Sequence, residues 1–442
     1  MKIITSYDTK IMNSIDENGV IVSLNKKVLN DTLSECRRAL AFIISVANEH
    51  FSEWKDLNSQ EKCNFVEKLI HNTENNKAVC DFDLQFKKFP SYLRRSAVSK
   101  AIGIVDSYHS NLDNWKKSGK KGSEPKLNTN HFWDVSFYRS AGGDIQVNGY
   151  MTVNLRVFQQ NDWKWMPLLL KGTDVSYIER HCLNKKGLSP SLKKVHGEYY
   201  FTWAFEERKD LVGGNALDYK ICAVDMGVLT DATCSIMDSE GTVYARKFIR
   251  CAYEKDQLNH LLNRIKRNQK NKQSVKKLWV YAKNFNTEIS RKTANAIIDF
   301  AIENDASCIV FEYLDTTGRK HGPRKQRLQH WKHREIQQLV ELKAHHFGLH
   351  ISHVCAWGTS KLAFDGSREV KRGKQISENT PYDICQFSTG KVYNCDLNAS
   401  YNIGARYFLR EFERLEMGYD LSSTPKRTLS DLKKQNSAMW LL

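Results

Sequence analysis

The order of patterned segments between residues 219 and 410 constrains the fold more than any other feature of this sequence. A buried strand, YKICAVD, precedes a strand hairpin, TDATCSIMDSEGTVYARKFI, that turns at residues 239–241. One or more long helices then reach about residue 304. A strand (SCIVFE), a helix (HWKHREIQQLVELKAHHFG), a strand (LHISHVC) and a helix from Asp396 follow. Three antiparallel strands followed by alternating helices and strands predict an α/β sheet with RNase H-like order.

Three carboxylates stand at the ends of these predicted elements. Asp225 ends the first strand in CAVDMGV, Glu312 ends the fourth in CIVFEYL, and Asp396 begins the last helix. Singly, each is explained as a turn or helix-capping residue. Together they predict a site, because the carboxyl ends of strands in α/β sheets form ligand sites. Crowded carboxylates raise one another's pKa, and two Mg²⁺ ions, or Mn²⁺ in their place, would compensate the charge and support phosphodiester hydrolysis. Asp396 can serve as cap and as ligand.

The first half of the chain has a different pattern. Strand-like alternation over the first 30 residues gives way to helical spacing from about Leu29 to Leu112. A polar linker, KKSGKKGSEPKLN, occupies residues 116–128, and strand-like text resumes over residues 131–207. An Asn148-Gly149 pair between alternating runs predicts a hairpin. We expect an antiparallel barrel or sandwich here, completed by the N-terminal strands, so the chain is multidomain.

The net charge and the spacing of the cysteines indicate the kind of partner and the cellular compartment to expect. Lys and Arg total 67 against 50 Asp and Glu, a formal net charge of +17, which favours a polyanionic partner and nucleic acid before membrane. No apolar run approaches the roughly 20 residues that a membrane span needs. The start of the chain lacks the features of a signal or transit peptide. Eleven cysteines form no C-x-x-C pair, which indicates reduced thiols and a cytoplasmic protein.

The segments around the three acids carry a resemblance to a known family. "AVDMGV", "IVFEYL" and "YNCDLNASYNIGARY" resemble the three motifs of the RuvC-type nuclease of TnpB proteins and compact type V CRISPR effectors. The text between them, including "ISRKTANAIIDFAIENDASCIVFE" and "HWKHREIQQLVELKAHHFGLHISHVCAWGTSK", is also similar to that family. The resemblance is strong over residues 219–410, and upstream the order of helical insert, linker and strand-rich region is consistent with it.

The resemblance implies an activity, partners and a domain plan. The activity would be RNA-guided, two-metal cleavage of DNA beside a short flanking motif, with guide RNA and target DNA as partners and a monomer or homodimer as the working form. Its catalytic and metal-binding residues would be Asp225, Glu312 and Asp396. The plan is a wedge β-barrel (1–30 and 125–212), a helical recognition lobe (31–124), a RuvC-like nuclease (213–355 and 391–415), a degenerate zinc-finger-like loop that would bind target nucleic acid (356–390) and a C-terminal tail (416–442).

One departure from the family concerns zinc. Relatives commonly carry two C-x-x-C pairs between the second and third motifs, the first after a Thr-Ser. Here KLAFDGS follows Thr359-Ser360 without a cysteine, and the second pair keeps only Cys385. We therefore expect no zinc, with Phe364 and Phe387 as apolar anchors of the loop. A substitute set of ligands is conceivable only from His353, Cys355, Cys385 and Cys395.

Three stretches poor in acids are candidate phosphate-binding surfaces. Residues 86–126 hold ten Lys or Arg against three acids, and residues 257–287 and 316–334 hold eight and seven with none. A single charge run usually marks a solvated face, whereas three shift the balance to phosphate contacts. The candidates are Lys87, Lys88, Arg94, Arg95, Lys116, Lys117, Lys120, Lys121, Arg264, Lys266, Arg267, Lys270, Arg319, Arg324 and Arg327. Phe89, Tyr92 and Tyr108 would stack on bases or pack in a helical core, and we expect Trp163 and Trp165 in the barrel core.

Two other functions compete with RNA-guided cleavage. A resolvase- or transposase-like nuclease would keep the fold and recognise DNA structure directly, but such an enzyme needs no large basic front half. A nuclease-dead, RNA-guided DNA-binding regulator would be free to lose the three acids, which are intact here.

Overall fold

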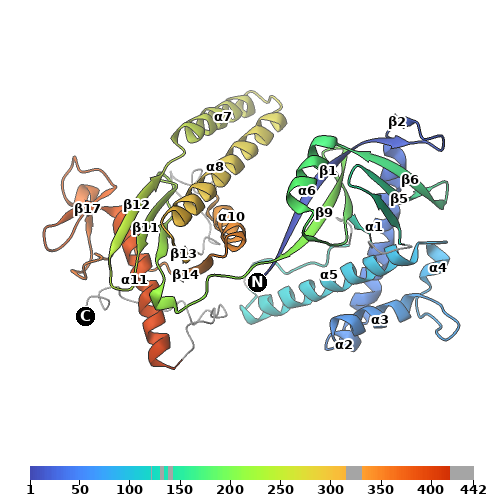
Figure 1. Cartoon of the computed structure of the whole chain (residues 1–442), viewed down its shortest axis with the longest axis horizontal. Coiled ribbons are helices and arrows are strands. Elements are labelled where there is room, and N and C mark those ends of the chain that lie inside the picture. The colour runs from blue at the N-terminus through green and yellow to red at the C-terminus, as the bar shows by residue number, and fades with distance from the viewer. Residues whose placement is uncertain (121, 130–133, 138–142, 315–330, 419–442) are drawn as a thin grey trace. The chain divides into compact units, whose positions relative to one another are not determined.

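The computed structural model describes residues 1–120, 122–129, 134–137, 143–314 and 331–418. The chain divides into two compact units, which we call the front unit (Lys2–Glu207) and the back unit (Arg208–Leu442 with Met1) (Figure 1). Among the helices described, none combines the length and apolarity needed to cross a membrane.

The front unit is built on an antiparallel sheet that curls as a half-barrel. Its described strands follow the order β3-β8-β9-β1-β6-β5-β4, with β2 added to β1 and β7 to β9. The N-terminal strand β1 is central, as expected, and among the described residues the path ends at β3 and β4, so the predicted antiparallel barrel is present as a curled half-barrel. The strands are β1 (Lys2–Ile15), β2 (Ile21–Ser23), β3 (Asp134–Ser136), β4 (Ile145–Asn148), β5 (Thr152–Gln159), β6 (Asp162–Leu170), β7 (Lys186–Gly187), β8 (Ser191–Val195) and β9 (Glu198–Arg208).

The predicted hairpin at Asn148-Gly149 is confirmed. Asn148 of β4 pairs with Thr152 of β5, and Gly149 supplies the left-handed backbone of the turn at φ +65°. The strand-like reading failed at residues 172–182, which form helix α6 (Gly172–Cys182). Val175, Ile178 and Cys182 are its buried side chains, a helical spacing hidden among strands.

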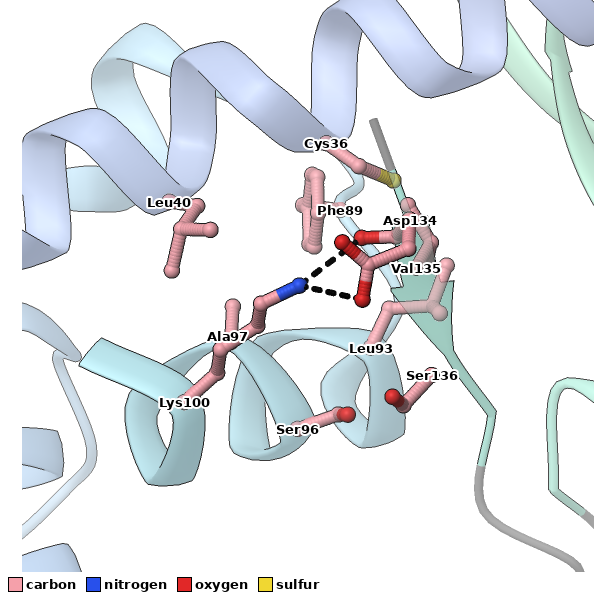
Figure 2. Close-up of a pocket in the computed structure, with 10 residues that line it drawn as sticks. All are labelled: Cys36, Leu40, Phe89, Leu93, Ser96, Ala97, Lys100, Asp134, Val135 and Ser136. Atoms are coloured by element: carbon pink, nitrogen blue, oxygen red, sulfur yellow. Dashed lines mark hydrogen bonds and ion pairs between the residues drawn. The ribbon is translucent and has the colours of Figure 1, made fainter. Parts of the chain in front are cut away.

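Helices of the front unit lie against the sheet and share its core. The helices are α1 (Lys26–Glu49), α2 (Phe51–Trp54), α3 (Ser59–Ile70), α4 (Phe82–Gln85) and α5 (Ser91–Lys117). The Asn25 side chain caps α1 by accepting a hydrogen bond from the Val28 N–H. Figure 2 shows a small pocket where α1 and α5 meet β3: Lys100 of α5 reaches the carboxylate of Asp134 at 2.6 Å beside Cys36 and Leu40. That ion pair satisfies the lysine inside an otherwise largely apolar contact.

The back unit is built on a mixed sheet of order β12-β11-β10-β13-β14. The pairs β10/β11 and β11/β12 are antiparallel, whereas β10/β13 and β13/β14 are parallel. This confirms the strand order predicted from the sequence, including the turn after Asp238. The strands are β10 (Ile221–Asp225), β11 (Ala232–Met237), β12 (Val243–Ile249), β13 (Cys308–Tyr313) and β14 (His350–Cys355). A separate small antiparallel sheet comprises β15 (Lys371–Arg372), β16 (Ile384–Gln386) and β17 (Val392–Asn394).

Helices cover both faces of the five-stranded sheet. α8 (Lys276–Glu303) and α10 (His333–His346) lie on one face and α11 (Cys395–Glu416) on the other, while α7 (Ala252–Lys270) packs on α8. Short 3₁₀ turns lie at Ala216–Asp218 and Gly373–Gln375. Alternate strand residues serve the two faces: Val224 and Phe311 pack with α8 and α10, whereas Ala223 and Val310 pack with α11. Gly404 permits the close approach of α11, because a Cβ there would lie 2.1 Å from the Met237 sulfur.

Candidate active site

The three acids predicted from the sequence come together on the α11 face of the five-stranded sheet. Val224 of β10 pairs with Phe311 of β13, so Asp225 and Glu312, the next residues of two parallel strands, project from neighbouring positions toward α11. Asp396 is the second residue of α11. Two strand ends and one helix start therefore aim carboxyls at one region.

Asp396 does not cap its helix. The cap is Asn394, whose side-chain oxygen accepts hydrogen bonds from the backbone N–H groups of Asp396 (3.0 Å) and Leu397 (3.1 Å). The capping half of the sequence interpretation is therefore wrong. Because Asn394 satisfies the helix start, the carboxyl of Asp396 is available to the site. Burial raises its pKa, and a hydrogen bond with Thr230 acts in the opposite direction.

Glu312 is buried, Asp225 and Asp396 are half-buried, and the three carboxyls lie close enough to affect one another. Burial raises the pKa of Asp225 well above its usual range, and the charges of Glu312 and Asp396 raise it further. Burial also raises the pKa of Glu312, against a hydrogen bond donated by the Thr359 hydroxyl and the charge of Arg406. Such a cluster favours a compensating cation.

Two arginines supply part of that compensation. Arg372 of β15 donates from Nε to the Cys395 sulfur at 3.0 Å, and its charge opposes the rise in the pKa of Asp225 and of Asp396. Arg406 is fully buried in α11 and donates from Nη1 to the Cys355 carbonyl at 2.6 Å. Its Nε and Nη2 have no hydrogen-bond acceptor among the described residues. The acid cluster thus has positive charge on two sides.

The donor set suits Mg²⁺ or Mn²⁺ in chemistry, because all three groups are carboxylates. Within the described part of the chain, however, no three His, Cys, Asp or Glu side chains converge tightly enough to form a ready-made metal site. Thr359 and Thr230 hold two of the carboxyls through hydrogen bonds. The acids fit a divalent cation by type and charge, and ligation would require those carboxyls to turn toward it.

One polar face of α11 fixes the end of β14 and the segment that follows it. Its members occur every four residues and therefore lie on one side of the helix. Each donates to the segment spanning residues 352–364: Asn398 to Leu362 O (2.8 Å), Asn402 to Thr359 O and Leu362 O (both 2.8 Å), Arg406 to Cys355 O (2.6 Å), and Arg410 to His353 O (3.1 Å) and Ser352 Oγ (2.8 Å). These bonds place Thr359 beside Glu312.

The loop that lacks the usual zinc ligands has an apolar core of its own. Phe364 and Phe387 pack edge to face with ring centroids 5.4 Å apart, which confirms them as anchors. Cys385 and Cys395 belong to the same cluster. His353 and Cys355 lie on β14, Cys385 on β16 and Cys395 at the start of α11, so the four candidate substitute ligands are divided among three elements.

Sequence reasoning missed Arg372, Thr359 and Thr230 as neighbours of the acids. Arg372 stands in a charged run, SREVKRGK, that gives no sign of facing inward. Thr359 was noted only as a flank of the missing cysteine pair. No periodicity links any of the three to the acids, because Thr359 and Thr230 lie in loops and Arg372 on a strand of two residues.

The candidate nucleic-acid contacts fall in different settings. Exposed side chains are Lys87, Lys88, Arg95, Lys116, Lys117 and Lys120 in the front unit and Arg264, Lys266, Arg267 and Lys270 on α7. The prediction that Arg94 binds nucleic acid is wrong. Its side chain is buried and paired with Glu67 at 3.2 Å, so it stabilises the helices of the front unit. Lys121, Arg319, Arg324 and Arg327 lie outside the described residues.

The predictions for the aromatic side chains also have mixed outcomes. Phe89 and Trp163 pack against each other in the front core with centroids 5.1 Å apart, so both are core residues. Trp165 is 37% exposed, with the Arg156 guanidinium 5.4 Å from its ring centroid, so the prediction that it belongs to the core is wrong. Tyr92 and Tyr108 are half-buried on α5.

The chain is similar in fold to solved effector complexes. Against the Cas12f1 chain of a Cas12f1–sgRNA–target DNA complex it has a TM-score of 0.60 at 14% identity, over 91% of this chain and 98% of that one. Against a chain of the Cas12i1 R-loop complex after target DNA cleavage the TM-score is 0.45 at 10% identity, over 90% of this chain and 68% of that one. Against C2c1 of Alicyclobacillus acidoterrestris in complex with single-guide RNA the TM-score is 0.40 at 10% identity, over 87% of this chain and 70% of that one.

Sequence comparison adds one match. Residues 19–159 match the model of the Aq_aa04 family, and no curated protein matches the chain. The Cas12f1 match, which spans nearly the whole of both chains, shows a shared fold.

Proposed function

We propose that this chain is an RNA-guided DNA endonuclease that binds a structured guide RNA, recognises a short flanking DNA motif and hydrolyses DNA at Asp225, Glu312 and Asp396. The observation that carries the proposal is the convergence of three acids, one buried and two half-buried, at two parallel strand ends and a helix start. The Cas12f1-like fold supports the guided form, because that neighbour is complexed with sgRNA and target DNA.

In this proposal the front unit and the back unit have different roles. In the back unit, residues 213–355 and 391–415 form the RuvC-like nuclease, and residues 356–390 contact target nucleic acid. In the front unit, residues 1–30 and 125–212 form the wedge and residues 31–124 the recognition lobe. Exposed lysines and arginines on α5 and α7 bind phosphates, which attracts RNA and DNA regardless of sequence. The chain works as a monomer or a homodimer.

The three carboxylates would hold two Mg²⁺ ions, with Mn²⁺ as a substitute. When bound, such ions polarise the scissile phosphate and lower the pKa of a water nucleophile. In the absence of ions, Thr359 and Thr230 hold the carboxyls of Glu312 and Asp396 through hydrogen bonds, from which the carboxyls would turn toward the ions. Arg372, beside the acids, reduces their repulsion.

The decisive experiment compares cleavage of one DNA target with its matched guide, with a mismatched guide and without RNA. Cutting only with the matched guide supports the proposal. Equal cutting in all three reactions would favour the resolvase-like alternative. Guide-dependent binding without cutting would favour the nuclease-dead regulator.

The acids are tested by Ala replacements of Asp225, Glu312 and Asp396, each of which should abolish cleavage while guide-RNA binding persists. Asp299→Ala is the matched control, because Asp299 is an exposed acid on α8 of the same unit and should leave cleavage unchanged. An acid variant that still cuts at the wild-type rate would remove its residue from the site.

A further inference from the structure

The edge strand β12 carries an unusual row of side chains. Its residues alternate between exposed and partly buried positions, and the exposed ones are Tyr244, Arg246 and Phe248, followed by Arg250 just beyond the strand. Tyr244 is 53% exposed and Phe248 42% exposed. Large aromatic side chains left open to solvent beside arginines are typical of binding surfaces.

Strand register places part of this row on the face that bears the acids. Arg246 pairs across the sheet with Ser235, whose hydroxyl contacts that of Ser400 in α11 at 2.5 Å. Arg246 therefore lies on the α11 face, and Phe248, two residues later, lies on the same face.

The same register aligns Phe248 with the acid site. Phe248 pairs with Thr233 of β11, and Thr233 pairs with Asp225 of β10. The three residues form one row across three strands. With strands spaced about 4.8 Å apart, the backbones of Phe248 and Asp225 are about 10 Å apart. The exposed ring thus stands two strands away from the first acid, with only Thr233 between them in the row.

Two arginines bracket this ring. The Arg250 guanidinium lies 5.9 Å from the Phe248 ring centroid, and the Arg246 guanidinium lies 5.6 Å from that of Tyr401 in α11. Arg246 also forms a hydrogen bond with the Tyr401 hydroxyl. Burial raises the pKa of Asp396, and Arg250 is close enough for its charge to act against that rise.

We propose that Arg246, Phe248 and Arg250, here called the β12 rim, bind the single DNA strand that is to be cut. An unpaired base stacks on Phe248, and the two arginines hold flanking phosphates. Stacking selects a single strand because duplex bases already have both faces covered. The rim rests on the proposed nuclease function and adds to it a positioning surface beside the acids.

The test measures binding, so that it does not depend on cleavage. The full chain with its guide RNA, carrying Asp225→Asn, is titrated with a labelled single-stranded DNA oligonucleotide and with the matching duplex. Adding Phe248→Ala should weaken single-strand binding about tenfold, and Phe248→Trp should preserve it. Duplex and guide-RNA binding should not change. Tyr244→Ala is the matched control, because this exposed ring of the same strand lies farther from the acids and bonds Asp238.

The arginines give a second readout. Single-strand affinity should fall with salt, and replacing Arg246 and Arg250 together by Gln should reduce the slope of log K against log salt by about 1.4. Unchanged single-strand binding by Phe248→Ala would overturn the proposal, as would an equal loss for Tyr244→Ala. A change of oligomeric state in Phe248→Ala would also overturn it, by assigning the edge to a second copy of the chain. If the rim binds as described but matched guides never direct cutting by the wild-type chain, the nuclease function fails while the rim stands.

Discussion

The two faces of the back-unit sheet are built in opposite ways. The face under α8 and α10 is closed by aliphatic and aromatic side chains such as Val224, Ile297, Ile309 and Phe311, all at most 2% exposed. The face under α11 has an apolar part around Phe408 but also buries polar groups completely: Asn398, Ser400, Asn402 and Arg406 are each 0% exposed.

The difference separates stability from function. An apolar face is stabilised by removing hydrocarbon from water, about 25 cal/mol per Å². A buried polar group costs stability unless it is hydrogen-bonded, and Asn398 and Asn402 of α11 meet that need through backbone carbonyls of the segment after β14. The acids remain under mutual repulsion. We therefore expect the α8/α10 face to control folding and the α11 face to control chemistry.

The largest effect on stability should come from the apolar face. Phe311→Ala removes a fully buried ring and should cost about 3–5 kcal/mol of unfolding free energy. Urea denaturation measures this. Phe412→Ala, at a 38% exposed position of α11, is the matched control and should cost far less. Equal losses at the two positions would break the distinction between buried and exposed packing in this unit.

The contact of α11 with the sheet should tolerate an added side-chain atom less well than an ordinary helix surface does. Gly404→Ala forces a Cβ against the Met237 side chain and should cost about 1–3 kcal/mol, with partial recovery when Met237→Ala is added. Gly103→Ala on α5 is the control, because a Cβ there meets nothing within 4 Å. That variant should stabilise by about 0.4–1 kcal/mol. A neutral Gly404→Ala would show that α11 has room to shift.

A smaller effect, on rate, should follow loss of the positive charge beside the acids. Arg372→Met removes a charge that lowers the pKa of Asp225 and Asp396, so the acidic limb of the pH–rate profile should move to higher pH. Cleavage near neutral pH should fall on the order of tenfold, less than the ~10²–10³ typical of a fully buried electrostatic donor. Lys371→Met, the exposed neighbour on β15, should leave the profile in place. A shift in both variants would point to general surface charge.

The smallest effect should be that of zinc removal. Elemental analysis should find far less than one zinc per chain, and a zinc-selective chelator should leave the thermal midpoint unchanged, because the loop has its own apolar core. Stoichiometric zinc would show a ligand set that neither the sequence nor the described residues indicate.

The sequence was sufficient for elements whose patterns are local. Buried runs such as ICAVD and CIVFE, each ending in an acid, predicted the strands and the two strand-end acids, because the strand ends of a parallel pair share one edge. The last helix was predicted equally well from the sequence, but its N-cap residue was not. Asn394 and Asp396 are both good capping residues, and only the hydrogen bonds show that Asn394 takes that role.

The rest depended on contacts between distant residues. Arg372 reaches the acids from the two-residue strand β15 and Thr359 from a loop, and neither segment has a periodic pattern in the sequence. Helix α6 was hidden by its strand-rich surroundings. Arg94 stood in a basic run, and a run of charges does not reveal which member turns inward to meet Glu67. Tertiary structure decided each of these.

We propose that Asp225 belongs to an acid cluster that lowers stability and that a bound divalent cation would compensate its charge. The raised pKa of Asp225 means that its contribution to stability is present at acid pH, below its unfolded pKa, and is lost as the pH rises through the folded value. The most direct measurement is the unfolding of wild-type protein and Asp225→Asn near neutral pH, with and without Mg²⁺. Asp225→Asn should be at least as stable as the wild type without Mg²⁺, and Mg²⁺ should stabilise the wild type much more than the variant. An Asp225→Asn protein that is clearly less stable without Mg²⁺, with equal stabilisation of both proteins by the ion, would contradict the account.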